Sequence, residues 1–149
     1  GSGVMIIRPC GVSIRENRLL TMRYHYADQD RFNLPGGGVE GDEQVVEALQ
    51  REYREELGVD IIPGNLLFCC ETLIHGRHVL HLAFDVKELI GTPRCNHSAT
   101  SALEVVWFPL ENLGRETLYP AIGPELQSVY LHGLSRTVYL GRVEQPWYE

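Results

Sequence analysis

Residues 37–59 read GGVEGDEQVVEALQREYREELGV, and this stretch decides the fold. Its leading glycines favour a loop, whereas the apolar residues that follow recur at helical spacing. The pattern predicts a helix from about Glu43 to Leu57, with Asp42 as the N-cap and Gly58 as the C-terminal stop. A short extended segment, residues 32–34, is expected immediately before the glycines.

Three glutamates of the predicted helix occupy one arc of its surface. At about 100° per residue, Glu55 and Glu56 fall about 60° and 40° to either side of Glu52. Apolar residues of the same helix lie in or beside this arc, and Glu43 lies on the opposite face. We therefore expect Glu52, Glu55 and Glu56 to face inward and Glu43 to face outward.

Such a cluster of carboxylates is costly unless something binds it. Glu52 repels Glu55 at i+3 and Glu56 at i+4, and anions near the C-terminal end of a helix oppose its dipole. A divalent cation removes this repulsion, and Mg²⁺, or Mn²⁺ in its place, prefers oxygen ligands. The preceding glycines, residues 36–38, permit close approach of the backbone, so that carbonyls can face a metal and amides a phosphate. A solvated acidic patch is the structural alternative, but the apolar neighbours on the same arc argue against it.

The spacing of these residues resembles the Nudix hydrolase box, G-x5-E-x7-R-E-U-x-E-E-x-G-U, where U is usually a bulky aliphatic residue. The matching positions are Gly37, Glu43, Arg51, Glu52, Glu55, Glu56, Gly58 and Val59. Tyr53 departs from the aliphatic preference, but it falls on the apolar face and can pack there. Outside the box, residues 34–40 and 107–113 also resemble segments that are common in the family.

The resemblance implies an α/β/α sandwich with a mixed β-sheet, and hydrolysis of a phosphoanhydride bond in a nucleoside diphosphate linked to another group. The metal ligands that it implies are Glu52, Glu55, Glu56 and the carbonyl of Gly36. Arg51 would orient the acids, and Glu43 would have a structural role. A metal-activated water would attack phosphorus, with Glu52 or Glu104, on the loop before Trp107, as the general base.

The rest of the chain predicts strands on both sides of this helix. The expected strands span residues 4–14, 19–26, 66–74, 78–86, 105–108 and 137–143, with loops over residues 27–31 and 89–103. A second helix should begin at Pro124 and end near Gly133. These elements predict one α/β (α+β) domain over residues 1–149, of which residues 1–3 look like the remnant of an expression tag.

The charge of the chain limits the partners that it can bind. Its net charge of −7, from 13 basic and 20 acidic residues, disfavours long nucleic acid, which requires a basic face. A small nucleotide-type diphosphate stays compatible, because a bound metal can reverse the field inside one cleft.

No apolar run reaches the roughly 20 residues of a membrane span. The cysteines lack zinc-like spacing and indicate reduced thiols in a cytoplasmic protein. A homodimer is compatible with the resemblance, but no sequence patch identifies an interface.

Candidates for substrate contacts lie outside the acidic cluster. Arg23 could reach a phosphate, Phe32 could stack on a base together with Tyr24 and Tyr26, and Gly37 opens the turn; packing or solvation is the competing interpretation for each.

Two other functions compete with hydrolysis of a small nucleotide. The first is a non-catalytic nucleotide-sensing domain of the same fold, and the second is an RNA 5′-end pyrophosphohydrolase. The retained box glutamates argue against the first, and the acidic net charge argues against the second.

Overall fold

The computed structural model describes residues 3–114 and 118–145, so Gly1 and Ser2 of the expected tag remnant lie outside the described residues. The elements in chain order are β1 (Met5–Val12), β2 (Ile14–Arg15), β3 (Arg18–Tyr26), β4 (Gln29–Asn33), α1 (Val45–Leu57), β5 (Asp60–Ile74), β6 (Arg77–Ile90), β7 (Glu104–Pro109), the 3-10 turn η1 (Leu110–Asn112), β8 (Leu118–Tyr119), α2 (Gly123–His132) and β9 (Val138–Arg142). Among the described residues no helix is long and apolar enough to cross a membrane.

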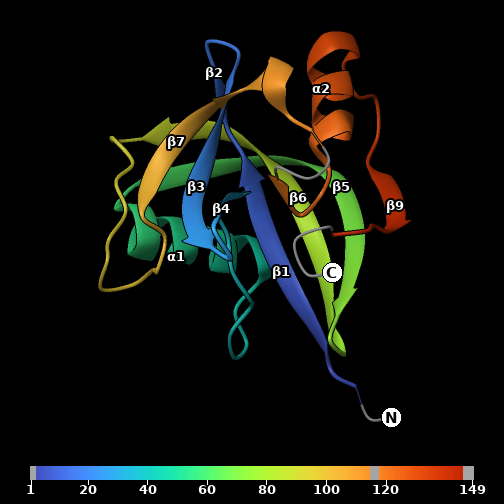
Figure 1. The fold of residues 1–149 in the computed structure, drawn as a ribbon, viewed down its shortest axis with the longest axis horizontal. Coiled ribbons are helices and arrows are strands. Elements are labelled where there is room, and N and C mark those ends of the chain that lie inside the picture. The colour runs from blue at the N-terminus through green and yellow to red at the C-terminus, as the bar shows by residue number, and fades with distance from the viewer. Residues whose placement is uncertain (1–2, 115–117, 146–149) are drawn as a thin grey trace.

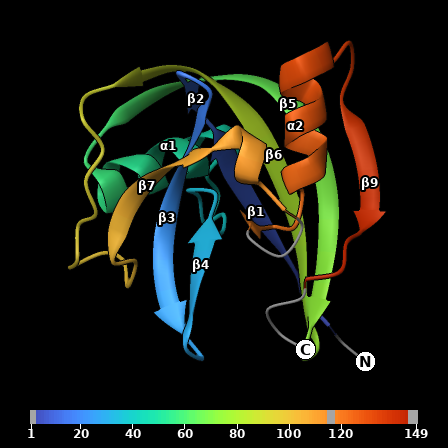
Figure 2. The same cartoon turned by 45° about the horizontal axis from the view of Figure 1, so that its top comes forward.

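The strands form two mixed sheets. One sheet has the order β1-β6-β5-β9, in which β1 is parallel to β6 and β9 is parallel to β5, whereas β5 and β6 form a long antiparallel hairpin. The other has the order β2-β3-β4-β8, with β7 on the free side of β3. Figures 1 and 2 show α1 at the left of the molecule and α2 at the upper right. The expected mixed α+β fold is confirmed.

Each helix covers its own apolar core. The core under α1 contains Leu49 and Tyr53 from the helix and Leu20 from β3. The core under α2 contains Leu126 from the helix and Leu19 from β3. Because consecutive residues of a strand point to opposite faces, β3 contributes to both cores in turn. The two helices therefore lie against opposite faces of the strands, as in a helix–sheet–helix sandwich.

The helix α1 starts later than the sequence pattern predicts, with Gln44 and not Asp42 as its N-cap. Two side chains bind backbone amides just before the helix. The carboxylate of Glu43 accepts a hydrogen bond from the amide of Glu40 (2.8 Å), and that of Glu47 accepts one from the amide of Gln44 (2.7 Å). Glu43 is therefore part of the preceding turn, which a helical wheel cannot represent.

The C-terminal end of α1 is as predicted. Gly58 follows the helix with a left-handed φ of 65°, and its amide donates to the carbonyl of Arg54 (3.1 Å). A residue without a Cβ adopts this conformation at little cost, so the glycine ends the helix.

The predicted loop over residues 27–31 is wrong, because most of it belongs to a hairpin. Ala27 and Asp28 have φ values of 53° and 59° and form a two-residue turn, after which β4 begins. Asp30 on β4 then pairs across the hairpin with Arg23 and with His25 on β3. These cross-strand polar contacts favour strand pairing of a polar segment.

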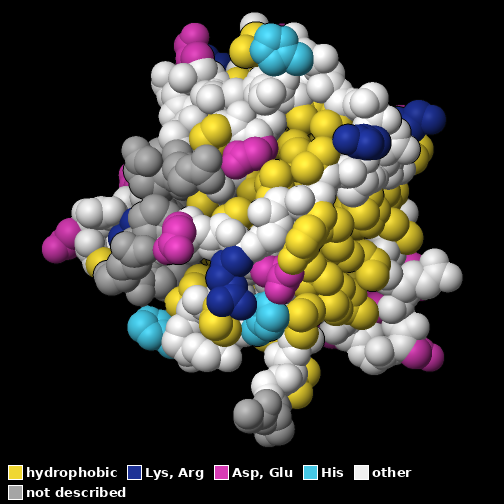
Figure 3. Space-filling view, turned by 90° about the vertical axis from the view of Figure 1, so that its right-hand side faces the viewer, with side chains coloured by type: hydrophobic (Ala, Val, Ile, Leu, Met, Phe, Trp, Pro, Cys, Tyr) yellow, Lys and Arg dark blue, Asp and Glu magenta, His cyan; other side chains and the backbone are white. Residues whose placement is uncertain are grey.

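The hairpin of β5 and β6 is longer than predicted, and it carries an apolar outer surface. Figure 3 shows hydrophobic side chains gathered on the side of the molecule where β5 and β9 lie. Leu73 and Tyr139 are among the exposed ones. Glu71 of β5 pairs with His78 and accepts a hydrogen bond from the hydroxyl of Tyr139.

Candidate active site

Arg51 on α1 gathers the acidic side chains of the site. Its guanidinium makes two bonds to Glu43 (2.8 and 3.1 Å) and one each to Glu52 (2.9 Å) and Glu55 (3.2 Å). It also donates to the carbonyl of Gly38 (3.1 Å), which fixes the glycine turn against the helix. These contacts, led by the bonds to Glu43, raise the pKa of Arg51 above its ordinary value. Arg51 therefore joins Glu43, Glu52 and Glu55 to the glycine turn.

Glu43 does not face outward, contrary to the helical wheel. It lies before α1, and its side chain is only 19% exposed because it packs along the guanidinium of Arg51. The bonds from Arg51 and from the amide of Glu40 hold the pKa of Glu43 below its usual range. Its contacts are therefore structural, and they complete the partners of Arg51.

Gly37 makes room for the carboxylate of Glu52. A Cβ added at Gly37 would overlap the Cδ and Oε1 atoms of Glu52 and would lie 2.8 Å from Oε2. The Glu52 side chain is only 13% exposed as a result. The amide of Gly37 already donates to the carbonyl of Pro9 (3.2 Å). In this geometry Gly37 contributes space for Glu52 and not a donor for a phosphate.

Gly36, the implied backbone ligand, is fastened to β1. It forms an antiparallel bridge with Cys10, through hydrogen bonds that join the carbonyl of Pro35 to the amide of Gly11 and the carbonyl of Pro9 to the amide of Gly37. A Cβ at Gly36 would overlap the carbonyl of Pro9. Its own carbonyl takes part in neither of these two bonds and lies in the same turn as Gly37.

Glu56 and Glu52 form a half-buried carboxyl pair at the centre of the site. Burial of Glu56, and then its hydrogen bond to Glu52 and the negative charge of Glu52, raise the pKa of Glu56 to about 8. Two carboxylates held this close favour a shared proton in the absence of another cation. A divalent oxygen-seeking ion such as Mg²⁺ or Mn²⁺ can take the place of that proton, so the donor set fits the implied metal.

Glu55 does not share the inward face that the wheel predicts for it. Its side chain is 54% exposed and bonds to Arg51, whereas Glu52 is largely covered. Within the described part of the chain, no three acidic, histidine or cysteine side chains are already gathered around one point. Binding of an ion by all three acids therefore requires the exposed Glu55 side chain to turn toward Glu52 and Glu56.

Arg8 on β1 is a half-buried cation next to this cluster that the sequence patterns missed. It donates to the carbonyl of Leu34 (2.8 Å), and its guanidinium lies 5.3 Å from the ring centre of Tyr119. Burial raises the pKa of Glu56 and lowers that of His81; the positive charge of Arg8 opposes part of the rise at Glu56 and adds to the fall at His81. The one signal for it in the sequence is a lone charge in the apolar strand MIIRPCGV.

Buried polar atoms without partners also lie in this region. Among the described residues, Nη1 of Arg8, Oδ1 of Asn33 and Nδ1 of His81 are buried and make no hydrogen bond. Arg8 and His81 are paired in register across β1 and β6, and the ring of Tyr119 contacts both side chains. Buried polar atoms are normally satisfied, so these atoms offer a donor and an acceptor to a ligand.

The predicted substrate residues Arg23 and Phe32 lie apart from the acids. They are paired in register on neighbouring strands, and Phe32 packs edge-on against Phe108 (4.9 Å between ring centres). Tyr24 is the next residue along β3. Burial raises its pKa, and the negative charge of Glu56 adds to that rise. Because side chains alternate along a strand, Arg23 and Phe32 point away from the face on which Tyr24 borders Glu56.

Glu104 is the first residue of β7 and not part of a loop. It lies opposite Arg23, and their side chains form an ion pair (3.0 Å). Arg23 also binds Asp30 (3.1 Å). The structure thus places Glu104 with Arg23 and not in contact with the three acids of α1, as far as the described contacts show.

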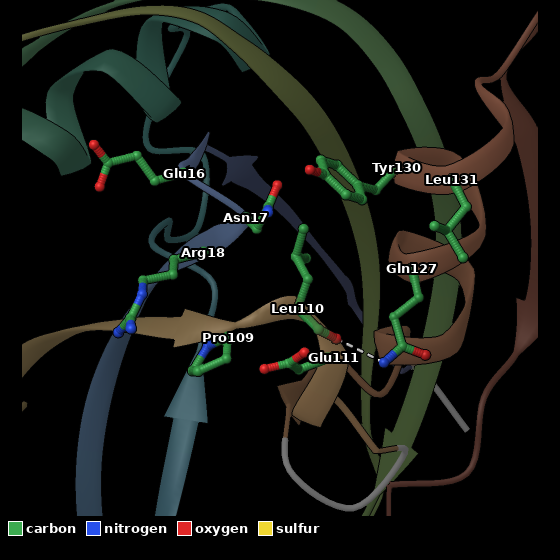
Figure 4. A pocket seen from close by; sticks show the side chains of 9 residues that line it. All are labelled: Glu16, Asn17, Arg18, Pro109, Leu110, Glu111, Gln127, Tyr130 and Leu131. Atoms are coloured by element: carbon green, nitrogen blue, oxygen red, sulfur yellow. Dashed lines mark hydrogen bonds between the residues drawn. The ribbon is translucent and has the colours of Figure 1, made fainter.

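A groove elsewhere on the surface lacks the chemistry of this site. It has a volume of about 610 Å³ and lies between the β2–β3 turn, η1 and α2, with Asn17 on one side and Tyr130 on the other (Figure 4). Gln127 of α2 donates to the carbonyl of Leu110 across one end (2.6 Å). The groove does not include the acids or the glycine turn.

A family model and several known proteins match this chain. A family model described as the NUDIX domain matches residues 6–129. The chain is 34% identical to the CTP pyrophosphohydrolase of Escherichia coli K12 over 74% of this chain and 79% of that protein. It is 35% identical to the 8-oxo-dGDP phosphatase NUDT18 of Danio rerio over 52% of this chain but only 23% of that longer protein. The solution structure of the E. coli ORF135 protein superposes with a TM-score of 0.73 at 28% identity, covering 91% of this chain and 95% of the other.

Proposed function

Because the chain belongs to the Nudix hydrolase family and is a Nudix enzyme, we propose that it cleaves the pyrophosphate linkage of a small nucleotide with a divalent cation, Mg²⁺ or Mn²⁺. The observation that carries the proposal is the half-buried carboxyl pair of Glu52 and Glu56 beside Gly37. Glu55 and the carbonyl of Gly36 complete the proposed ligand set. The names of the relatives, a pyrophosphohydrolase and a nucleotide phosphatase, support the bond that is broken.

The protein's own residues have distinct tasks in this reaction. When bound, the cation would supply charge neutralisation for the diphosphate and a more acidic water. Glu52, Glu56 and Glu55 would hold the cation, and the exposed Glu55 side chain would have to turn toward the other two. Arg51 keeps the carboxylates oriented. We assign the general base to Glu52 in preference to Glu104, because Glu52 lies in the cluster whereas Glu104 is held by Arg23.

The substrate class that we propose is a nucleoside triphosphate, with CTP as the first compound to test. The named activity of the E. coli relative motivates this choice. Arg8 and Asn33, with their unpartnered buried atoms, support recognition of a polar ligand close to the acids. The net charge of −7 supports a small substrate over a long RNA.

The test is a product assay on the purified chain. CTP, the other nucleoside triphosphates, 8-oxo-dGDP and a 5′-capped RNA would each be incubated with and without Mg²⁺ or Mn²⁺, and the released phosphates identified. We expect metal-dependent release of pyrophosphate from a nucleoside triphosphate. Tight nucleotide binding with no turnover across the panel would instead establish the sensor function, and turnover of the capped RNA alone would establish the RNA function.

A further inference from the structure

The last turn of α1 has backbone carbonyls that the helix cannot satisfy by itself. The local C-terminal turn satisfies two of them, since the amide of Val59 bonds to the carbonyl of Tyr53 (3.4 Å) and that of Gly58 to Arg54 (3.1 Å). The next three carbonyls belong to Glu55, Glu56 and Leu57. Their donors come from the loop of residues 91–103, which is remote in sequence.

Asn96 provides two of these three donors. Its side-chain Nδ2 donates to the carbonyl of Glu55 (3.0 Å), and its amide donates to the carbonyl of Glu56 (2.8 Å). The amide of Arg94 supplies the third bond, to Leu57 (3.1 Å). A single residue therefore fixes the backbone of two adjacent acids in the proposed ligand set.

Asn96 also organises the loop from which it reaches the helix. Its Oδ1 accepts from the amide of Ser98 (3.2 Å), and its carbonyl accepts from the amides of Ala99 (2.9 Å) and Thr100 (3.0 Å). Thr100 then contacts the hydroxyl of Tyr24 (3.4 Å), the residue that borders Glu56. The loop is thus anchored at the acid-bearing turn and again on β3.

We propose that Asn96 is a positioning residue for the divalent-cation site, because it holds the last turn of α1 so that Glu55 and Glu56 face one ion. The inference rests on the proposed function. Adjacent residues of a helix point about 100° apart, so two neighbouring carboxylates reach one ion only if their backbone is held in a narrow range of orientations. Exposed Glu55 depends on this hold most, because its side chain must turn in from solvent.

The test measures binding of Mn²⁺ alone, by electron paramagnetic resonance or calorimetry, to the full chain and to variants. Asn96→Asp keeps the Oδ1 that orders the loop but loses the donor to Glu55, and Asn96→Ala loses both. Ser98→Ala is the matched control, because Asn96 uses only the backbone of Ser98. We expect the Mn²⁺ dissociation constant to rise about tenfold in both Asn96 variants and less than about twofold in the control.

The Asp variant separates positioning from charge. Its added negative charge alone would tighten cation binding, so weaker binding in Asn96→Asp supports the positioning role, whereas tighter or unchanged binding overturns it. Saturating Mn²⁺ should restore most of the turnover of Asn96→Asp. If the wild type binds Mn²⁺ and hydrolyses nucleotide, and the Asn96 variants do both equally well, this inference is overturned and the proposed function stands. Wild type that binds no Mn²⁺ would overturn the proposed metal site as well.

Discussion

The backbone of Gly37 lies directly against the carboxylate of Glu52, with no room for a side chain between them. The neighbouring Gly38 is different, because a Cβ added there would meet nothing nearer than Ile6 at 3.8 Å. We therefore expect Gly37→Ala to displace Glu52 and to lower turnover on the order of a hundredfold. Gly38→Ala should keep turnover within a few-fold of wild type.

The measurement for this pair is steady-state kinetics at saturating metal, with thermal unfolding of both variants as the control for folding. Equal losses in Gly37→Ala and Gly38→Ala would show that the turn tolerates no side chain at all. In that case the specific contact between Gly37 and Glu52 would not explain the loss.

The contact between Tyr53 and Gly11 explains how the chain accommodates a tyrosine where the Nudix pattern prefers an aliphatic residue. The ring of Tyr53 lies over Gly11, and a Cβ at Gly11 would overlap the hydroxyl and approach Cζ to 2.8 Å. We expect Gly11→Ala to lower the free energy of unfolding by about 1–3 kcal/mol through overpacking. Tyr53→Leu should lower it by about 2–5 kcal/mol through the cavity that it leaves.

The double variant tests whether these two positions are coupled. The added methyl group enters space that Tyr53→Leu vacates, so the double variant should be more stable than the sum of the single effects by about 1 kcal/mol or more. Urea unfolding of all four proteins measures this coupling. Strict additivity would mean that Gly11 is required for its backbone and not for Tyr53.

Glu56 should be essential for turnover but not for folding. Glu56→Gln removes a proposed metal ligand, so we expect turnover to fall by more than about a hundredfold, the upper end of what loss of an outer-shell partner costs. In the metal-free protein the same change replaces a carboxyl whose pKa burial and Glu52 raise to about 8, and an amide needs no proton to sit beside Glu52, so the unfolding temperature should stay the same or rise. Kinetics and metal-free thermal unfolding check the two parts separately, and wild-type turnover in this variant would remove Glu56 from the site.

The general base can be assigned by comparing two carboxylates. Glu52→Gln should lower turnover by about 10²–10⁴-fold, the usual contribution of a general base. Glu104→Gln breaks the ion pair with Arg23 and should cost less than about tenfold, because the described contact of the Glu104 side chain is with Arg23 and not with the three acids of α1. Turnover numbers at saturating metal measure both changes. A loss in Glu104→Gln as large as that in Glu52→Gln would instead assign the base to Glu104.

Local spacing was sufficient to predict α1, its stop at Gly58 and the acids that it carries. It failed where a contact joins distant residues. A helical wheel assumes that Glu43 belongs to the helix, so it cannot show that Glu43 turns back onto Arg51. Asn96 reads as an ordinary loop residue, because its partners Glu55 and Glu56 are remote in sequence. The position of Arg8 beside the acids likewise depends on how strands pair, which local patterns do not determine.

His81 should make stability depend on pH. Its ring is buried and contacts the hydroxyl of Thr72 (2.9 Å), and burial, with the positive charges of Arg8 and Arg77, lowers the pKa of His81 to about 3. An unfolded histidine titrates near 6.5, so between about pH 6.5 and 3 the unfolded chain binds more protons than the folded one. Stability should therefore fall with decreasing pH in this window, by up to about 1.4 kcal/mol per pH unit from this residue.

Urea unfolding of wild type and His81→Gln between pH 7 and pH 4 isolates this contribution, because other groups titrate alike in both proteins. We expect the slope of unfolding free energy against pH to be shallower in His81→Gln. His75→Asn is the matched control, since His75 is exposed in a turn with a φ of 49°, a conformation that asparagine tolerates. A slope in His81→Gln as steep as in wild type would show that His81 is protonated in the folded protein.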